Sequence, residues 1–266
     1  NIIIVMLFFN LFAKLILWTA AWIATSYQPA VPRKYSEVDL PLRRRSDVMT
    51  VPGHWESAEA ARLSECVPCW PAGAPVVACC VAGKSVEDEI ASVLAGRFPP
   101  VRWLRSSAEA CGVRNHYEEP ERLGADRWAA MLGARGFVQG ACLVVCAGTA
   151  TTVDWLDGDG EFRGGLILPG VDLMRSSLAR NTAQLPFAEG RFQTAPRNTA
   201  DAIFSGCLQA QIGAVERMYS AMRDESEVLC LLTGGAAPCL APHLSIPFQL
   251  VENLILDGLV RFGAST

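Results

Sequence analysis

Two charged side chains stand together at the start of a predicted helix. In "LGADRWAAMLGARG", Asp126 and Arg127 precede a run rich in Ala, Leu and Met. The first backbone amides of a helix have no partner within the helix and favour an anion. The pair could therefore serve catalysis, or it could be an ordinary helix cap beside a solvent-facing arginine. The residue types alone leave both interpretations open.

A second stretch, "CAGTATTVD", gathers hydroxyl side chains after a glycine. Gly148 and Thr149 fall in a predicted tight turn between two strands, and Thr151 and Thr152 follow. Backbone amides and hydroxyl groups in such a loop can hold a phosphate without a helix dipole. Threonine also suits strands in general, so a Thr-rich strand explains the same residues.

A pair of glycines follows a predicted strand near the C-terminus. In "SEVLCLLTGGAAPCL", the strand runs into Gly234 and Gly235, and a short helix comes next. In α/β proteins this layout leaves room for a nucleotide at the carboxyl end of a sheet.

No metal centre is predicted from the cysteines and histidines. Cys66 and Cys69 form a single CxxC without a second pair, which favours an ordinary loop over zinc or redox chemistry. The three histidines, His54, His116 and His243, are scattered. Several of the ten cysteines lie in apolar runs, as buried thiols do in a reduced compartment such as the cytoplasm.

Length and charge narrow the classes of function. A chain of 266 residues can hold one large domain or two of ordinary size. Its net charge of -4 and its pI near 5.5 argue against binding to nucleic acid or to an anionic membrane. Small-molecule chemistry is the function class that remains.

The apolar opening has three interpretations. Residues 2–25 are long enough to span a bilayer, but Lys14 would lie near the middle, at a cost of about 2.5–3.5 kcal/mol. A cleaved signal peptide needs a basic stretch before its apolar core, and only Asn1 precedes this one. The third interpretation is a buried strand, "IIIVMLFF", a turn at Asn10 and a second strand to Trp18.

From Ala74 onwards strands and helices alternate. "APVVACCVAG" predicts a strand, and "KSVEDEIASVLAGRF" a helix with Ser85 as its N-cap and Gly96 at its end. "PVRWLRSS" predicts another strand, and three strands joined by tight turns span Cys142 to Pro169. The rest is mainly helical apart from the strand before Gly234. This order predicts an α/β fold with two similar halves.

An ordered set of motifs resembles the type III pantothenate kinase family, also called the Bvg accessory factor family. The set runs from Gly112 to the C-terminus: "GVRNHY", "LGADRWAAMLGAR", "AGTATTVD", "DGEFRGGLILPG", "SSLARNTAQLP", "NTADAIFSGC", "TGGAA" and "LILDGL". The resemblance implies two duplicated actin-like (ribonuclease H-like) domains, residues 1–135 and 136–266, each with a mixed sheet flanked by helices. A cleft between them would close around ATP, and the protein would be a cytoplasmic homodimer.

The resemblance also assigns roles to individual residues. Asp126 would be the general base on the primary hydroxyl of pantothenate. ATP would be the phosphoryl donor, with magnesium as the cofactor. Thr149 would touch the ATP phosphates. The other residues implied in pantothenate binding are Tyr117, Gly124, Ala125, Arg127 and, from the facing subunit, Thr182; those implied in ATP binding are Asn10, Lys14, Gly148, Gly234 and Gly235.

Two stretches depart from the family pattern. The phosphate-binding hairpin Asp-x-Gly-Asn-Ser/Thr-x-x-Lys, laid on residues 7–14, keeps Asn10 and Lys14 but places Leu7 at the aspartate and Phe9 at the glycine. A missing carboxylate removes a group expected to hold magnesium, and phenylalanine prevents close approach of the backbone. Cys146 stands where many relatives carry an aspartate that binds potassium or ammonium.

Three hypotheses of function follow. The first is an active kinase that makes 4'-phosphopantothenate, the first step of coenzyme A biosynthesis. The second is a catalytically impaired binding or regulatory protein that keeps the acceptor pocket but has lost the N-terminal phosphate loop. The third, ranked last, is a membrane-anchored relative.

Overall fold

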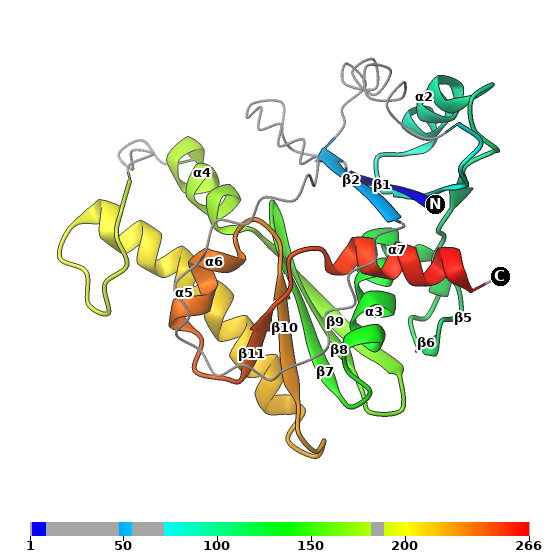
Figure 1. Cartoon of the computed structure of the whole chain (residues 1–266). Helices are drawn as coiled ribbons and strands as arrows, with labels where there is room; N and C mark the ends of the chain where they lie inside the picture. The colour runs from blue at the N-terminus through cyan, green and yellow to red at the C-terminus, as the bar shows by residue number, and fades with distance from the viewer. Residues whose placement is uncertain (1, 9–47, 55–71, 182–188, 266) are drawn as a thin grey trace. The chain divides into compact units, whose positions relative to one another are not determined.

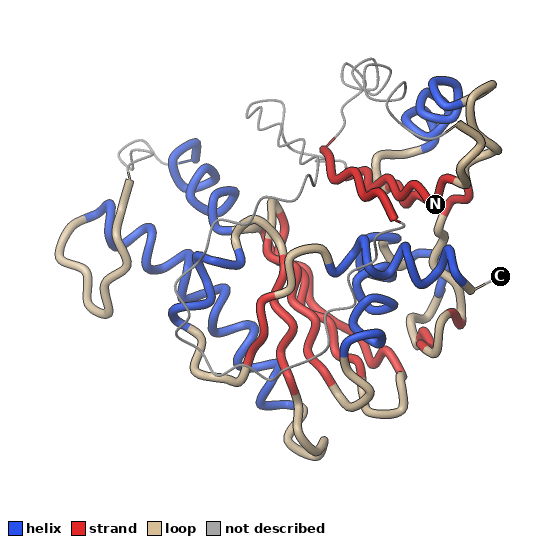
Figure 2. Tube along the Cα trace, viewed as in Figure 1, coloured by secondary structure: helices blue, strands red, loops and turns tan. Residues whose placement is uncertain are grey.

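A computed structural model describes residues 2–8, 48–54, 72–181 and 189–265 of the chain (Figure 1). By its internal contacts the chain forms two compact units. The first unit comprises Asn1–Ser106, Gly124–Gly133 and Ile255–Thr266, and the second comprises Ser107–Leu123 and Ala134–Leu254. The predicted mixed α/β architecture is confirmed (Figure 2). The predicted domain boundary after residue 135 and the cleft between two duplicated halves stay predictions.

The first unit contains a four-stranded parallel sheet in the order β2-β1-β3-β4. Its strands are β1 (Ile2–Phe8), β2 (Val48–His54), β3 (Val76–Cys80) and β4 (Arg102–Trp103). The apolar opening is therefore a strand over Ile2–Phe8, as its third interpretation predicts. Asn10 and the predicted second strand to Trp18 lie outside the described residues, as do Cys66 and Cys69. No helix in the described part of the chain is long and apolar enough to cross a membrane.

Helix α2 (Lys84–Leu94) packs its apolar stripe on the same core cluster as β3. The side chains of Val86, Ile90 and Leu94 are buried there, at the helical spacing that the sequence predicts. The prediction of Ser85 as N-cap is wrong, because Gly83 occupies that position with a φ of +98°. The positive φ of Gly83 lets the chain turn there, so the helix begins two residues earlier than an N-cap at Ser85 would place it.

Helix α3 (Ala125–Phe137) begins in the first unit, where it meets helix α7 (Leu254–Ala264). Gly258 of α7 approaches Ala129 of α3 so closely that a Cβ added to the glycine would lie 1.8 Å from the Ala129 carbonyl oxygen. The absence of a side chain at this position allows the two helices to touch backbone to backbone.

Gly258→Ala is expected to lower the free energy of unfolding by about 3 kcal/mol, because a methyl group cannot enter a contact with backbone that has no space to yield. Chemical denaturation measures this change. Gly206→Ala is the matched control, because Gly206 is also helical but has no atom within 4 Å of an added Cβ. Equal stability of the two variants would contradict the close helix contact.

The second unit contains a seven-stranded mixed sheet in the order β11-β10-β7-β8-β9-β6-β5. Strands β7 (Cys142–Ala147), β8 (Ala150–Leu156) and β9 (Glu161–Pro169) form the predicted antiparallel meander. Strands β10 (Leu229–Thr233) and β11 (Phe248–Leu250) extend it in parallel beyond β7. Strands β5 (Glu109–Ala110) and β6 (Val113–Asn115) form a short hairpin beside β9. The predicted strands and turns around Gly148 and Gly234 are thus confirmed.

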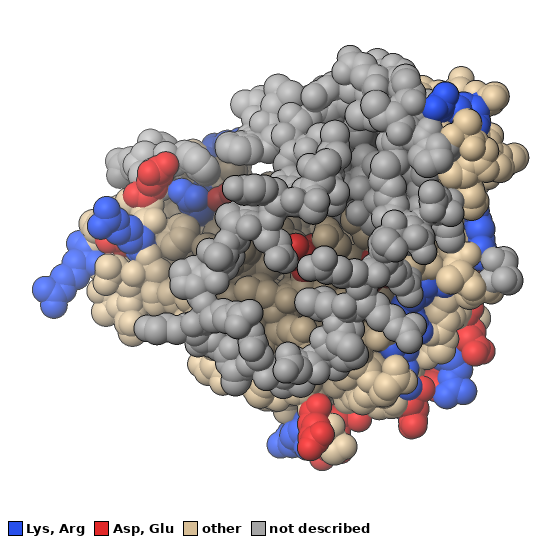
Figure 3. Space-filling model, viewed as in Figure 1, with Lys and Arg blue, Asp and Glu red and all other residues tan. Residues whose placement is uncertain are grey.

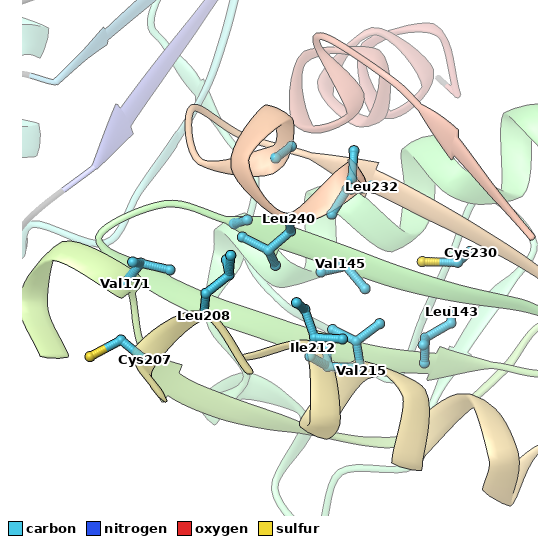
Figure 4. Packing of buried hydrophobic residues seen from close by; sticks show 14 of the residues in the cluster. Leu143, Val145, Val171, Cys207, Leu208, Ile212, Val215, Cys230, Leu232 and Leu240 are labelled. Atoms are coloured by element: carbon cyan, nitrogen blue, oxygen red, sulfur yellow. The ribbon is translucent and has the colours of Figure 1, made fainter. Parts of the chain in front are cut away.

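The core of the second unit lies between this sheet and helix α5 (Thr199–Ala221) (Figure 4). Leu143 and Val145 of β7 contribute to the same cluster as Leu208, Ile212 and Val215 of α5. The remaining helices are α4 (Val171–Asn181), the four-residue α6 (Ala237–Leu240), and the 3-10 turns η2 (Pro120–Arg122) and η3 (Ala241–His243).

Two cysteines of this unit confirm the interpretation of apolar runs as buried thiols. Cys142 and Cys230 are fully buried, and burial raises the pKa of each to about 12. Both groups therefore stay neutral at physiological pH. Where the face in Figure 3 is coloured by charge, Lys and Arg side chains lie beside Asp and Glu side chains at its left and lower edges.

Candidate functional site

The start of α3 holds the candidate catalytic carboxylate. Oδ1 of Asp126 accepts a hydrogen bond of 2.8 Å from the backbone N–H of Arg127. A Cβ added to Gly124 would lie 2.6 Å from the same oxygen, so the glycine leaves the space that the carboxylate occupies. Arg127 is 4% exposed, and Ala125 is buried. The four predicted acceptor-side residues, consecutive in the chain, therefore lie at the start of α3.

The surroundings of Asp126 make its carboxylate a stronger base. Burial raises the pKa of Asp126 above its ordinary value, because the charged form loses hydration. The Arg127 backbone N–H and its guanidinium lower the same pKa, but their effect is smaller than that of burial. A carboxylate with a raised pKa is a stronger proton acceptor than a solvated one.

The glycine loops of the second unit meet at one end of its sheet. Gly148 and Thr149 follow β7, while Gly234 and Gly235 follow the adjacent strand β10. The Ala147 carbonyl accepts a hydrogen bond of 3.0 Å from the Ala236 N–H. Gly234 has a φ of +99°, and an added Cβ would lie 2.2 Å from the Ala147 oxygen. The four predicted ATP-side residues of these loops are therefore close together, and all four are exposed.

A fourth glycine, Gly170, follows β9 and packs against the turn of Gly148 and Thr149. The Gly170 N–H donates to the Thr149 carbonyl at 2.7 Å. A Cβ on Gly170 would lie 2.1 Å from the Gly148 oxygen and 2.6 Å from the Thr149 oxygen. The turn that carries Thr149 is thus fixed by backbone contacts on both sides.

The threonines after this turn do not share its exposure. Thr151 and Thr152 are 1% and 7% exposed, and their Oγ1 atoms are buried without a hydrogen-bond partner in the described structure. Of the two interpretations that the sequence left open, the Thr-rich strand holds for Thr151 and Thr152, because both lie within β8 and are buried. Thr149 alone of these threonines lies in the exposed turn.

Tyr117 belongs to the second unit, on the loop after β6. Its ring is 37% exposed and stacks on Phe162 of β9, with the ring centroids 6.1 Å apart. Its backbone N–H donates to Oδ1 of Asn115 at 3.0 Å, while Nδ2 of Asn115 donates to the carbonyls of Ser107 and Pro120 at 3.2 and 3.1 Å. The buried Asn115 amide therefore shapes the loop that presents Tyr117.

An ion-pair cluster supports the same loop. Glu161 of β9 contacts both Arg114 and His116, which flank Asn115. These contacts lower the pKa of Glu161, chiefly through the hydrogen bond with His116. The loop from Arg114 to Tyr117 is thus attached to β9 by charge as well as by ring stacking.

Some predicted site residues lie outside the described part of the chain, and the sequence analysis missed two residues that support the candidate site. Asn10, Lys14 and Thr182 are not among the described residues. Asn115 and Gly170 were not predicted as site residues, although "RNHY" and "LPG" place them beside Tyr117 and the Thr149 turn. The described residues contain no group of three or more His, Cys, Asp or Glu side chains that could hold a metal ion.

Comparisons with known proteins give the family. The family model described as type III pantothenate kinase matches residues 49–221, a range that begins after Asn10 and Lys14. A type III pantothenate kinase from Aromatoleum aromaticum is 54% identical over 215 residues, covering 81% of this chain and 89% of the relative. One from Azoarcus sp. strain BH72 is 50% identical over 208 residues, covering 78% of this chain and 79% of the relative.

A solved structure shares the fold. It comes from Campylobacter jejuni, is named for the Baf family of transcriptional activators, and superposes with a TM-score of 0.51 at 19% identity. The match covers 76% of this chain and 85% of that one. Together, the family match over most of the described sequence and relatives at half identity or more establish that this chain is a member of the type III pantothenate kinase family.

Proposed function

We propose that the protein transfers the γ-phosphoryl group of ATP to the primary hydroxyl of pantothenate, giving 4'-phosphopantothenate and ADP, the first step of coenzyme A biosynthesis. The observation that carries this proposal is the partly buried carboxylate of Asp126 with its raised pKa at the start of α3. The name of the relatives, type III pantothenate kinase, supports pantothenate as the substrate and ATP as the donor.

In the proposed reaction Asp126 accepts the hydroxyl proton while the alcohol oxygen bonds to phosphorus. The bond between phosphorus and the bridging oxygen of ATP breaks, and ADP leaves with that oxygen. Because the alcohol becomes a better nucleophile as its proton departs, the base must be ionised when the substrate binds. Arg127, fixed by its buried position, provides a permanent positive charge for polar groups of the substrate.

The remaining acceptor contacts are proposed for Tyr117, Gly124, Ala125 and, from a facing subunit, Thr182. The exposed Tyr117 ring, braced by Phe162 beneath it, offers a flat surface and a hydroxyl group to a small polar molecule. Gly124 contributes room for the Asp126 carboxylate.

The ATP phosphates are proposed to bind at the turn of Gly148 and Thr149, with Gly234 and Gly235 beside them and with Asn10 and Lys14 of the N-terminal segment. The exposure of the four loop residues and the absence of side chains on three of them support this assignment. Magnesium is proposed to arrive bound to the ATP phosphates, since it usually keeps several waters and takes few protein ligands.

A monovalent cation held by charge does not fit the residues at Cys146. Its cross-strand neighbours are Thr152 on β8 and Thr233 on β10, so this row offers a thiol and two hydroxyl groups. Thiol ligands suit soft metals rather than alkali ions. The proposed mechanism therefore contains no step that depends on potassium or ammonium.

A homodimer in the cytoplasm is part of the proposal. Leu166 and Ile167 of β9 are 39% and 64% exposed, and Leu178 of α4 is 38% exposed. Ile167 is the most exposed of these apolar side chains, and the proposed dimer would cover it. Light scattering of the purified protein, with the mass of two chains as the expected value, measures the oligomeric state.

The alternative of a catalytically impaired binding protein is not favoured, because the relatives at half identity or more carry the kinase name. Turnover separates the two hypotheses. ADP release from ATP and magnesium is expected to depend on pantothenate and not to appear with glycerol or glucose as the acceptor. Folded protein that binds pantothenate but releases no ADP would favour the impaired protein.

A further inference from the structure

An amide side chain is buried in the apolar core between α5 and the sheet of the second unit. Gln211 of α5 is 0% exposed, and its neighbours Leu208, Ile212 and Val215 belong to the hydrophobic cluster between α5 and the sheet (Figure 4). A buried polar group lowers stability unless its hydrogen bonds are made. An amide at this position therefore needs a reason beyond packing.

The amide nitrogen of Gln211 makes its hydrogen bonds to the corner between β9 and α4. Its Nε2 donates to the Pro169 carbonyl at 2.6 Å and lies 3.6 Å from Sδ of Met174. The atom facing a carbonyl oxygen must be the donor nitrogen, which fixes the orientation of the amide. Its Oε1 is buried without a partner in the described structure. The Gln211 amide thus leaves its oxygen without a hydrogen bond, while its nitrogen contacts Pro169 and Met174 on either side of the corner.

That corner is the one that supports the Thr149 turn. Between Pro169 and Met174 lies Gly170, whose N–H donates to the Thr149 carbonyl and whose Cα leaves no room for a side chain against Gly148. The Met174 N–H in turn donates to the Gly170 carbonyl at 2.9 Å. A continuous set of short contacts therefore leads from Gln211 through Gly170 to Thr149.

We propose that Gln211 is a positioning residue for the nucleotide: it fixes the Pro169–Gly170 corner and, through it, the turn that binds the ATP phosphates. The inference rests on the proposed role of Thr149. Gln211 itself touches no substrate. It acts on the donor side alone, because Asp126 and Arg127 stand on a different helix, at the start of α3.

Gln211→Met in the full-length protein tests the proposal. Methionine has similar length and suits an apolar core, so we expect the midpoint of chemical denaturation to stay the same or rise. The KM for ATP and the Kd for ATP by calorimetry should each rise about fivefold, the loss expected for one hydrogen bond, while the KM for pantothenate changes less than twofold.

Val215→Ala is the matched control, one turn further along α5. It removes buried apolar volume and lowers stability without touching the Pro169 carbonyl, so the affinity for ATP should stay at the wild-type value. Unchanged affinity for ATP in Gln211→Met, or an equal loss in both variants, would overturn the proposal.

If the wild type binds ATP but makes no phosphopantothenate, the proposed function fails, and calorimetry with ATP still decides the role of Gln211. If the wild type does not bind ATP, both are overturned.

Discussion

Asp126→Asn is expected to lower kcat by about 10²- to 10⁴-fold at saturating ATP and pantothenate, because an amide cannot accept the hydroxyl proton. Asparagine preserves the shape of the side chain, and its carbonyl oxygen can still accept the hydrogen bond from the Arg127 N–H. The KM for pantothenate should therefore change much less than kcat. Initial rates of ADP release measure both quantities.

Asp88→Asn is the control for this substitution. Asp88 is an exposed carboxylate on α2 that pairs with Lys84, so its removal takes away one charge of the first unit without affecting α3. This variant should retain wild-type kcat. An Asp126→Asn enzyme with a kcat near the wild-type value would exclude Asp126 as the base.

Asp126→Asn should lower kcat but raise the stability of the folded protein at neutral pH. Burial raises the pKa of Asp126 in the folded state above its value in the unfolded chain. The contribution of this carboxyl to stability is therefore fully present below its unfolded-state pKa and is lost as pH rises through its folded-state pKa. Asparagine has no such loss. The stability of Asp126→Asn relative to wild type should therefore increase from acidic to neutral pH, which denaturation at several pH values measures.

Gly170→Ala is expected to reduce kcat/KM for ATP by about 10²-fold, because a displaced phosphate turn misplaces the reacting group. The added methyl would lie 2.1 Å from the Gly148 oxygen and 2.6 Å from the Thr149 oxygen, so the turn must move. The affinity for pantothenate, measured by calorimetry without nucleotide, should be preserved.

Gly213→Ala provides the comparison. Gly213 is an exposed residue of α5 with no atom within 4 Å of an added Cβ, so alanine should raise stability by about 0.5–1 kcal/mol and leave the kinetics with ATP unchanged. If Gly170→Ala also keeps wild-type kinetics, the turn of Gly148 and Thr149 does not bind the phosphates.

The elements that carry the site follow closely from local sequence. The start of α3 near Gly124 and the turn at Gly148 were predictable, because helical and strand periodicities change where glycine interrupts them. Ser85 shows the limit of this reasoning. A hydroxyl residue suggests a cap, but the left-handed backbone at Gly83 decides where α2 begins.

The supporting contacts could not be predicted from local pattern. Gln211 falls on the buried face of α5, where the sequence does not distinguish it from the other buried polar residue, Ser205, and its partner Pro169 lies 42 residues away. Asn115 acts through three backbone groups whose proximity depends on the fold. The burial of Thr151 and Thr152 likewise depends on what covers each face of β8. One missed element did have a local signal, since Cys111 and Gly112, both with positive φ, form the two-residue turn between β5 and β6.

The most direct test of the account is the identity of the product. Phosphorus NMR of the purified protein with ATP, magnesium and pantothenate should show a new phosphomonoester, which mass spectrometry identifies as 4'-phosphopantothenate, formed in equal amount to ADP. Folded protein that binds both substrates yet yields only inorganic phosphate, or no new phosphorus signal, would contradict the assignment of Asp126 and the Thr149 turn to phosphoryl transfer.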